Sequence, residues 1–407
     1  MKITITARIT RLRILVFCVS LLTVVSVTIV GSVEAGYLMP GAGQQTPAST
    51  QATATTQAAP AEKTVEQVEK NIQVLTGLPQ SQLVPVMNYM GSSLGVKCTF
   101  CHVKNGDKWD FVSDAKQEKG SAREMIKMVQ GINKGSFKGN PAIGCFTCHR
   151  GSEHPARVPQ LPIAAPTPFA EAAETAPKVT PPTADQILAK YTEALGGSAV
   201  IEKLKTRSMK GTWLTSDGIT LGYEVYQSAP DKLFTILNTP KQGVFERGFD
   251  GKTAWEKSSR GVRELEGTQL IYLRRYPDLF RDIKLQGQFN RISYGGKEKI
   301  DGKDVYVLRG VGVDGKGERL YFDAQTGLLV RRITSTTTMV GLIPEQVDYE
   351  DYREVDGMKL PFTIRITAID SFWSSTRKFT EIKLNVPVDE TKFNKPPAPP
   401  PAASSTP

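Results

Sequence analysis

Histidine and cysteine are scarce in this chain of 407 residues, which holds three histidines and five cysteines. Residues 183–395 contain neither type, and their sequence shows no metal-ligand cluster, no nucleophile elbow and no phosphate-binding loop. No block of basic residues is interleaved with aromatic residues, so the formal net charge of +10 does not predict nucleic-acid binding. That charge is typical of a soluble protein, or of a docking face for an acidic partner or an anionic membrane surface.

The scarce residues are concentrated in two short motifs. Residues 98–102 read CTFCH and residues 145–149 read CFTCH. This C-x-x-C-H spacing is the attachment signature of c-type haem, because two thiols on one helical turn can each form a thioether to a haem vinyl group. The adjacent histidine then supplies an axial nitrogen to the iron. We predict two covalently bound haem c groups, tethered by Cys98, Cys101, Cys145 and Cys148, with His102 and His149 as iron ligands.

A zinc site is the alternative for paired cysteines. Zinc ribbons usually bring their second pair within roughly 15 to 20 residues of the first, whereas Cys101 and Cys145 are much further apart. Zinc also gives no reason for a histidine directly after both pairs. The pattern therefore favours haem. The fifth cysteine, Cys18, lies in the N-terminal apolar run, so an exported protein with both haems attached has no thiol left for a disulfide.

The N-terminus has the pattern of an export signal. Lys2, Arg8, Arg11 and Arg13 precede an apolar run from Ile14 to Val30. Residues 33–35 resemble a small-x-small cleavage site before Gly36. We expect residues 1–35 to be a signal peptide that directs the protein to the periplasm. An uncleaved segment that anchors the chain to the inner membrane is the alternative. Export agrees with the motifs, because bacteria attach haem covalently outside the cytoplasm.

Composition divides the rest of the chain into folded units and linkers. Residues 36–61 are rich in Gln, Thr, Ala and Pro and predict a disordered linker, residues 156–182 form a Pro/Ala linker, and residues 396–407 a disordered tail. Between them we expect a diheme cytochrome c domain at 62–155 and a β domain at 183–395.

The first unit is predicted to be a small all-α domain. A Thr64-x-x-Gln67 capping box opens a helix that we expect to run to about residue 77. A second helix is expected from near residue 81 to the first motif. A third is expected from about Asp114 to Asn133, because apolar residues recur there at helical spacing.

Each iron needs a sixth ligand unless its site is open for chemistry. Outside the motifs the chain has only His154, so methionine sulfur is the remaining soft ligand, and His/Met ligation raises the reduction potential. Two methionines precede each motif on the expected helices: Met87 and Met90, then Met125 and Met128. Methionines on an apolar helix face are often core filler, and spacing alone does not choose within either pair.

Residues 81–151 resemble the cytochrome c subunit of photosynthetic reaction centres. That family repeats a methionine-bearing helix, a turn and C-x-x-C-H, and the stretch from Ala122 to Gly151 is close to its second haem unit. The resemblance implies that Met87 and Met125 are the distal ligands, with Met90 and Met128 as runners-up. It also implies one-electron transfer between a redox-protein donor and acceptor.

The chain also departs from that family. The family carries four haems, whereas this chain has two motifs. The family places a histidine between its second methionine helix and the following motif, whereas residues 134–144 contain none. We infer no photosynthetic role from the resemblance.

The second unit is predicted to be a predominantly antiparallel β domain with one or two helices. A Thr183-x-x-Gln186 capping box opens one helix, after which apolar residues alternate with period two. A helical interruption is expected from about Gln269 to Phe280. Five Asp-Gly pairs favour hairpins, which predicts a meander of roughly eight to eleven strands that curls into a barrel or half-barrel. The pairs lie at 217–218, 250–251, 301–302, 314–315 and 356–357.

Residues 321–329 and 356–362 are similar to segments of periplasmic lipoprotein-carrier and outer-membrane lipoprotein-sorting proteins. That resemblance implies an unclosed barrel whose concave apolar face holds acyl chains. The alternative function is therefore a carrier that binds an apolar ligand or lipoprotein at its β domain and has an appended redox domain. A deep apolar groove in residues 183–395 would favour the carrier. A filled core there would favour a scaffold. A diheme peroxidase is a third reading, and it needs an iron whose sixth ligand is absent or displaceable.

Overall fold

The computed structural model describes residues 62–158, 180–240, 242–266, 269–270, 273, 276–369 and 374–397. The expected signal peptide and first linker, most of the second linker and nearly all of the tail lie outside these residues. Within the described ranges, no helix is long and apolar enough to cross a membrane.

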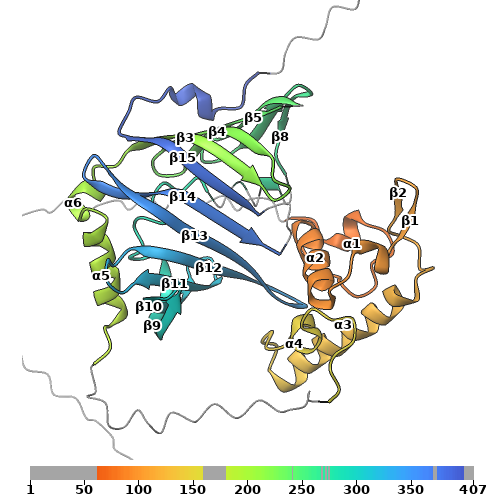
Figure 1. The fold of residues 1–407 in the computed structure, drawn as a ribbon. Helices are drawn as coiled ribbons and strands as arrows, with labels where there is room; N and C mark the ends of the chain where they lie inside the picture. The colour runs from red at the N-terminus through yellow and green to blue at the C-terminus, as the bar shows by residue number, and fades with distance from the viewer. Residues whose placement is uncertain are drawn as a thin grey trace, which may run out of the picture. The chain divides into compact units, whose positions relative to one another are not determined.

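The first folded region, residues 62–158, is mainly helical (Figure 1). It also contains a two-stranded hairpin, which differs from the expected all-α domain. Asn105 pairs with Lys108, so Gly106 and Asp107 form a two-residue loop, and Gly106 has the positive φ of 58° that such loops require. The elements are α1 (Val65–Val68), η1 (Gln80–Gln82), α2 (Leu83–Leu94), η2 (Cys98–Phe100), β1 (Val103–Asn105), β2 (Lys108–Asp110), α3 (Gln117–Ser136) and α4 (Cys145–His149).

The first helix is much shorter than expected. The backbone N–H of Thr64 does donate to Gln67 Oε1 at 3.1 Å, as the capping box predicts. The helix nevertheless ends at Val68, and Asn71 adopts a left-handed conformation with φ of 59°, which an α-helix cannot contain. The chain then folds back, and the Val65 N–H donates to Leu78 O at 2.8 Å. The apolar periodicity thus reflects a buried turn rather than a continuous helix.

The next two helices confirm the expectation. Helix α2 ends at Gly95, whose φ of 70° gives the left-handed C-cap. Helix α3 begins at Gln117 and places Ile126, Val129 and Asn133 on its buried face. The helices therefore share one small core, into which α2 contributes Val86 and Tyr89.

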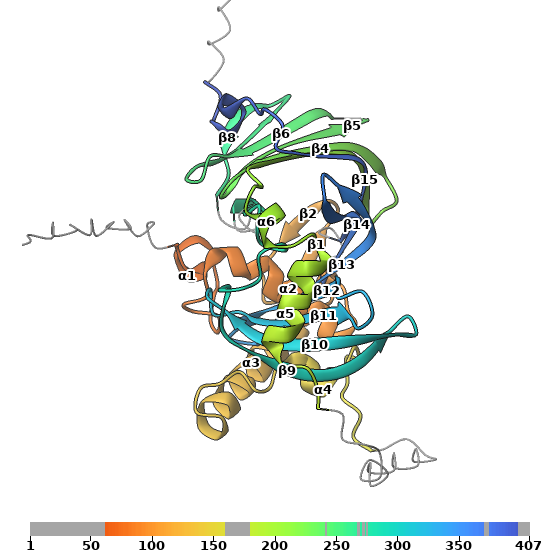
Figure 2. The ribbon, with the colours of Figure 1, turned by 90° about the vertical axis from the view of Figure 1, so that its left-hand side faces the viewer.

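The second folded region is a single antiparallel sheet of 13 strands among the described residues (Figures 1 and 2). Its order is β8-β7-β6-β5-β4-β3-β15-β14-β13-β12-β11-β10-β9, so pairing of β3 with β15 joins two meanders and leaves β8 and β9 at the edges. The expected strand count was too low. The strands are β3 (Thr206–Thr215), β4 (Thr220–Ser228), β5 (Lys232–Thr239), β6 (Gly243–Phe249), β7 (Ala254–Ser258), β8 (Gly261–Glu264), β9 (Phe289–Ile300), β10 (Lys303–Gly312), β11 (Gly317–Asp323), β12 (Leu329–Thr338), β13 (Gly341–Val355), β14 (Met358–Ala368) and β15 (Ser375–Leu384).

All five Asp-Gly pairs lie in turns between consecutive strands, as expected. At the β9–β10 turn, Asp301 and Gly302 have φ angles of 49° and 79°, the left-handed pair that a two-residue hairpin requires. Residues 269, 270 and 273 are helical, and Phe280 lies in a turn. The other residues between 267 and 275 are outside the described part, so the expected helical interruption is tested only in part.

One helix packs inside the curve of the sheet. Helix α5 (Ala184–Ala194) begins at Thr183, whose Oγ1 accepts from the Gln186 N–H at 3.2 Å, so the second capping box is confirmed. Tyr191 of α5 is buried in the same cluster as side chains from both meanders, including Tyr223 and Phe322. This core fills the concave side of the sheet. The described part of this region also contains two short helices, α6 (Ser198–Ile201) and η5 (Glu390–Phe393).

A charged cluster is enclosed within the β region. The Arg332 guanidinium donates to both carboxylate oxygens of Glu318, from Nε at 2.8 Å and from Nη2 at 2.9 Å. Its Nη1 donates to Asp282 Oδ1 at 2.8 Å. The side chains of Arg332 and Glu318 are only 4% and 6% exposed. Such a pair is tolerated because each charge has a partner, and removing one partner strands the other.

We therefore predict that Arg332→Met lowers the free energy of unfolding by about 3–5 kcal/mol, because it leaves the Glu318 charge buried without a cation. Arg365→Met is the matched control. Arg365 pairs with Glu350 across two exposed side chains, at 52% and 46% exposure, so its loss should cost less than ~1 kcal/mol. Urea unfolding of both variants measures the difference, and equal losses would contradict this account of the cluster.

Candidate functional site

The first motif forms one tight turn directly after α2. The His102 N–H donates to Cys98 O at 3.0 Å, so residues 98–102 wrap through a single turn. Cys98 is exposed and Cys101 is half-buried. Burial, together with Glu118, raises the pKa of the Cys101 thiol. Both thiols therefore lie on one turn, as attachment to a single macrocycle requires.

The second motif is a complete short helix, α4. Gly144 is its N-cap and donates its N–H to Thr147 Oγ1 at 3.0 Å, and Arg150 ends the helix in a left-handed conformation. Cys148 is exposed, and Cys145 is half-buried with its pKa raised by burial. The arrangement of the two thiols on one turn is the same as in the first motif.

The fold packs α2, the helix before the first motif, against α4, the helix of the second motif. The Gly151 N–H donates to Ser93 O at 2.8 Å, which joins the end of α2 to the residue after the second motif. Gly95 lies so close to the Gly151 carbonyl that any side chain there would overlap it. The Phe146 N–H also faces the Tyr89 hydroxyl at 3.4 Å.

The two motif histidines differ in their ring contacts. His149 Nδ1 lies 3.0 Å from Ser152 O. Because a carbonyl only accepts, Nδ1 carries a proton, which leaves Nε2 as the ring nitrogen that could bind a metal. His102 Nδ1 is buried and has no partner among the described residues. Burial and Lys119 lower the pKa of His102, which favours the neutral imidazole that a metal requires. The third histidine, His154, is exposed beside Glu153.

The four candidate methionines lie on α2 and α3, in two different settings. Met87 and Met90 are half-buried against the core that Cys145 also contacts. Met125 and Met128 are 44% and 45% exposed, and Ile132 continues the same face of α3 at 36%. This apolar stripe lies next to the buried side of α3, about 100° around the helix from it. Within each pair the residues are three apart on one face, so the structure does not choose between them.

These residues fit the haem that the motifs imply. Each motif presents two thiols on one turn, and His149 has its Nδ1 proton held by a carbonyl. The uncovered apolar stripe of α3 is a surface that a large apolar group can cover.

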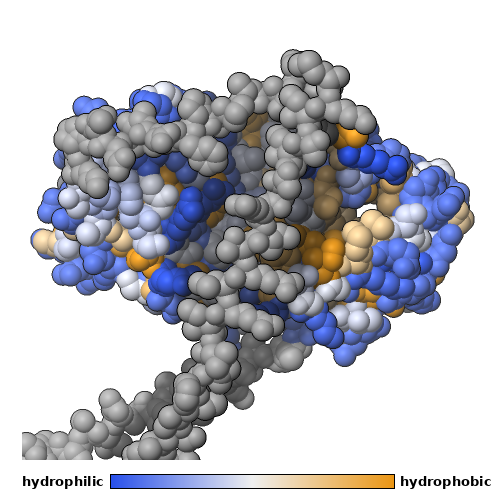
Figure 3. Space-filling view, turned by 90° about the horizontal axis from the view of Figure 1, so that it is seen from below, coloured by the Kyte–Doolittle hydropathy of each residue, from blue (hydrophilic) through white to orange (hydrophobic). Residues whose placement is uncertain are grey.

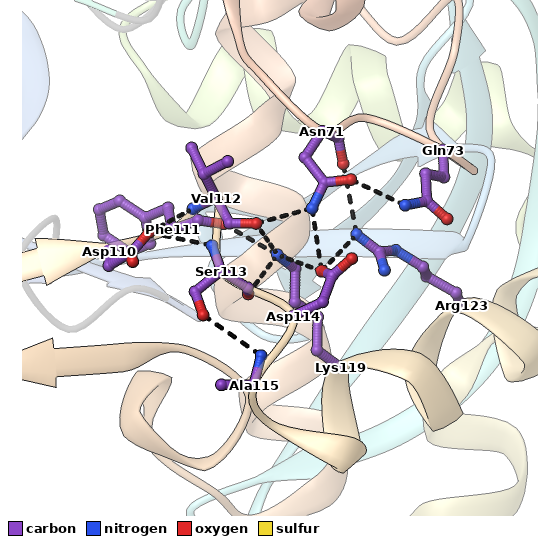
Figure 4. Close-up of polar contacts among 10 residues, drawn as sticks. All are labelled: Asn71, Gln73, Asp110, Phe111, Val112, Ser113, Asp114, Ala115, Lys119 and Arg123. Atoms are coloured by element: carbon purple, nitrogen blue, oxygen red, sulfur yellow. Dashed lines mark hydrogen bonds and ion pairs between the residues drawn. The ribbon is translucent and has the colours of Figure 1, made fainter.

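A network around Asp114 holds the segment between the first motif and α3 (Figure 4). Asp114 Oδ1 accepts from Asn71 Nδ2 at 2.9 Å and from Lys119 Nζ and Arg123 Nη2 at 3.0 Å each. Lys119 also donates to the carbonyls of residues 111–113. Phe111, which this network fixes, packs edge-on against the His102 ring at 5.1 Å between centroids.

Sequence reasoning missed this network. Asp114 was expected inside the third helix, but it lies before α3 and bonds to the loop after α1. The only local signal was a carboxylate followed by cations at positions 119 and 123. Its partner Asn71 lies in a turn. The apolar periodicity had predicted a continuous helix at that position.

The described part of the β domain contains a cavity of about 90 Å³. This cavity is lined in part by the polar groups of Arg207, Asp282 and Arg377. Small-molecule pockets usually measure ~300–1,000 Å³. The parts of this face that Figure 3 leaves uncovered carry both hydrophilic residues and apolar patches. Among the described residues, no group of three His, Cys, Asp or Glu side chains could hold a metal ion.

Comparison with known proteins finds that the motif region is similar to cytochromes. Residues 40–181, roughly a third of the chain, match the model of the family described as photosynthetic reaction centre cytochrome C subunit. Cytochrome c-554 of Chloroflexus aurantiacus is 34% identical over 89 residues, which are 20% of this chain and 20% of that protein. The photosynthetic reaction center cytochrome c subunit of Roseobacter denitrificans is 33% identical over 104 residues, 24% of this chain and 28% of its own length. The chain thus spans less than a third of these relatives, and the resemblance expected from the sequence is confirmed.

Solved structures similar to this chain cover its C-terminal half at low identity. A putative outer membrane lipoprotein-sorting protein domain from Vibrio parahaemolyticus has a TM-score of 0.39 and 14% identity, covering 51% of this chain and 95% of its own. A LolA superfamily protein from Nitrosomonas europaea has a TM-score of 0.37 and 16% identity, covering 53% and 99%.

The Asp114 network makes a prediction about stability and pH. Hydrogen bonds from Arg123, Lys119 and Asn71 hold the pKa of the Asp114 carboxyl well below its usual range. A lowered carboxyl pKa stabilises the fold above the unfolded value of about 3.9, and this contribution is lost as the pH falls below that value. Asp114→Asn should therefore lower the melting temperature modestly at pH 7, because the carboxyl is half exposed.

The difference between Asp114→Asn and the parent should shrink as the pH falls below about 3.9. Thermal unfolding at neutral and acid pH measures it. Asp107→Asn, at an exposed position in the β1–β2 turn, is the control and should match the parent at both. A difference that stays constant with pH would show that the Asp114 charge is not responsible.

Proposed function

We propose that this protein is an exported diheme c-type cytochrome that carries out one-electron transfer between periplasmic or membrane-bound redox partners. The observation that carries the proposal is the pair of C-x-x-C-H turns, each with both thiols on one turn and each preceded by a methionine-bearing helix. The match of residues 40–181 to a family of cytochromes supports it.

Each motif residue has a defined role in this proposal. Cys98, Cys101, Cys145 and Cys148 tether two haems, and His102 and His149 are the proximal ligands. Haem, when bound, supplies a one-electron couple whose potential depends on its axial ligands and burial. Ser152 O fixes the ring of His149 through Nδ1, and the apolar stripe of α3 excludes water from the face that it covers.

Met87 and Met125 are the proposed distal ligands, with Met90 and Met128 as runners-up. The resemblance to reaction-centre cytochromes supports this choice. With two protein ligands on each iron, no position is vacant for a substrate, so electron transfer is favoured over peroxidase chemistry. Donor and acceptor are then redox proteins, for which the formal net charge of +10 offers an electrostatic docking face to an acidic partner.

The carrier that binds an apolar ligand or lipoprotein stays the alternative function. An acyl chain needs a long apolar groove, whereas the cavity inside the described part of the β domain measures about 90 Å³ and is lined in part by arginine and aspartate side chains. We therefore propose the β domain as a scaffold for the cytochrome region.

The haem content tests the proposal directly. Protein matured in a bacterial periplasm should carry two covalent haems per chain, both low-spin, with the weak near-infrared band of methionine sulfur ligation. The double variants Cys98→Ser with Cys101→Ser, and Cys145→Ser with Cys148→Ser, should each retain one haem. One haem or none in the parent would refute the diheme proposal, and a high-spin ferrous site would point to a peroxidase.

The distal ligands can be tested by exchange for histidine. Met87→His and Met125→His should each leave both haems attached and lower the reduction potential of one haem, because imidazole stabilises the ferric iron more than thioether sulfur does. Met90→His and Met128→His are the matched controls, one turn away on the same helices, and should leave both potentials unchanged. Redox titration decides, and a shift in a control instead would reassign that ligand.

A further inference from the structure

The tip of one hairpin of the sheet is buried instead of exposed. Thr338 of β12 pairs with Gly341 of β13, so Met339 and Val340 form a two-residue loop. A loop of this kind normally meets water, yet Val340 is 0% exposed. It belongs to the same apolar cluster as residues of the motif region, namely Val65, Leu75, Leu78, Val86, Tyr89 and Ile126.

The hairpin tip contacts the start of α4, where the second motif begins. The Cys145 N–H donates to Val340 O at 3.4 Å, and the Cys145 Sγ lies 3.9 Å from the same oxygen. A methyl group on Gly144 would lie 2.7 Å from Val340 O and 2.6 Å from the Tyr89 hydroxyl oxygen. Only glycine therefore permits this approach. A methyl group on Gly341 would overlap the Tyr89 hydroxyl oxygen. Both glycines are therefore required where the hairpin meets α2 and α4.

The tip is braced from both sides. Within the hairpin, Thr338 Oγ1 donates to Gly341 O at 2.7 Å and accepts from the Val340 N–H at 3.3 Å. From the motif region, Gln130 Nε2 of α3 lies 3.4 Å from the Met339 sulfur. The loop thus has contacts with α2, α3 and α4, through Tyr89, Gln130 and Cys145 respectively.

We propose that the β12–β13 tip, residues 338–341, is a positioning element for the second haem-attachment helix. It fixes the N-terminal end of α4, covers one side of Cys145, and so sets the burial of the haem at residues 145–149. Because burial and solvent access tune a haem potential, the β domain controls one of the two potentials. The effect on a reduction potential rests on the proposed diheme function, whereas the positioning of α4 does not.

The test compares variants of the full chain matured with haem. Val340→Asp places a charge in the apolar cluster and should detach the tip. Hydrogen exchange at residues 143–149 should then become faster, because the Cys145 amide loses its acceptor. Both haems should stay attached, and one reduction potential should shift while the other keeps its parent value. Leu342→Asp is the matched control, two residues away on the same hairpin and 47% exposed, and should change none of these.

A milder variant, Val340→Ala, keeps the test decisive if Val340→Asp does not fold, and should give the same changes at smaller size. Unchanged exchange at residues 143–149 in the Val340 variants would overturn the proposal. Equal shifts of both potentials, or the same effects from Leu342→Asp, would overturn it too. If the parent does not carry two haems, the proposed function fails, and the exchange result by itself still decides whether the tip positions α4.

Discussion

The motif region buries very little apolar surface, and much of its structure follows from that constraint. Among residues 62–158, the buried apolar side chains are Val65, Leu75, Leu78, Val86, Tyr89, Ile126 and Val129. A core of this size stabilises a folded region of such length only weakly, and small domains usually add a covalent or metal staple. Two covalent haems would provide that staple, since each ties a turn of backbone to a large apolar group. The exposed stripe of Met125, Met128 and Ile132 is the surface that such a group would cover.

The β12–β13 tip adds buried apolar surface to the small core of the motif region. Val340 adds a fully buried side chain to the motif region's core, and the carbonyl of Val340 accepts from the first residue of α4. The β domain can provide this contact because its own core is large and its buried Arg332 is paired. Arg332 is enclosed with Glu318 and also pairs with the partly exposed Asp282, and α5 packs in the main core of the sheet. A rigid sheet holds a two-residue loop in place more firmly than a free hairpin could.

Polar contacts determine how the first motif is held. Asp114 gathers Asn71, Lys119 and Arg123 at one carboxylate, and the segment so fixed carries Phe111 against His102. The second motif instead depends on close backbone approach, with glycines at 95, 144 and 341 where a side chain would collide. The two proposed haem sites are therefore supported by different physics, one by charge and the other by packing, and they should respond differently to pH and to core substitutions.

Local chemistry by itself predicted the two C-x-x-C-H turns, the capping boxes at Thr64 and Thr183, and the five Asp-Gly turns, because each depends on residues a few positions apart. Contacts between distant residues decided the rest. The left-handed Asn71 ended α1 early because its side chain bonds to residues 112 and 114. Pairing of β3 with β15 joined two meanders into one sheet. Val340 is an ordinary apolar residue in the sequence. It belongs to the core of the motif region only because the folded sheet places the β12–β13 loop against that core. Burial and long-range pairing are properties of the whole chain, so no local pattern contains them.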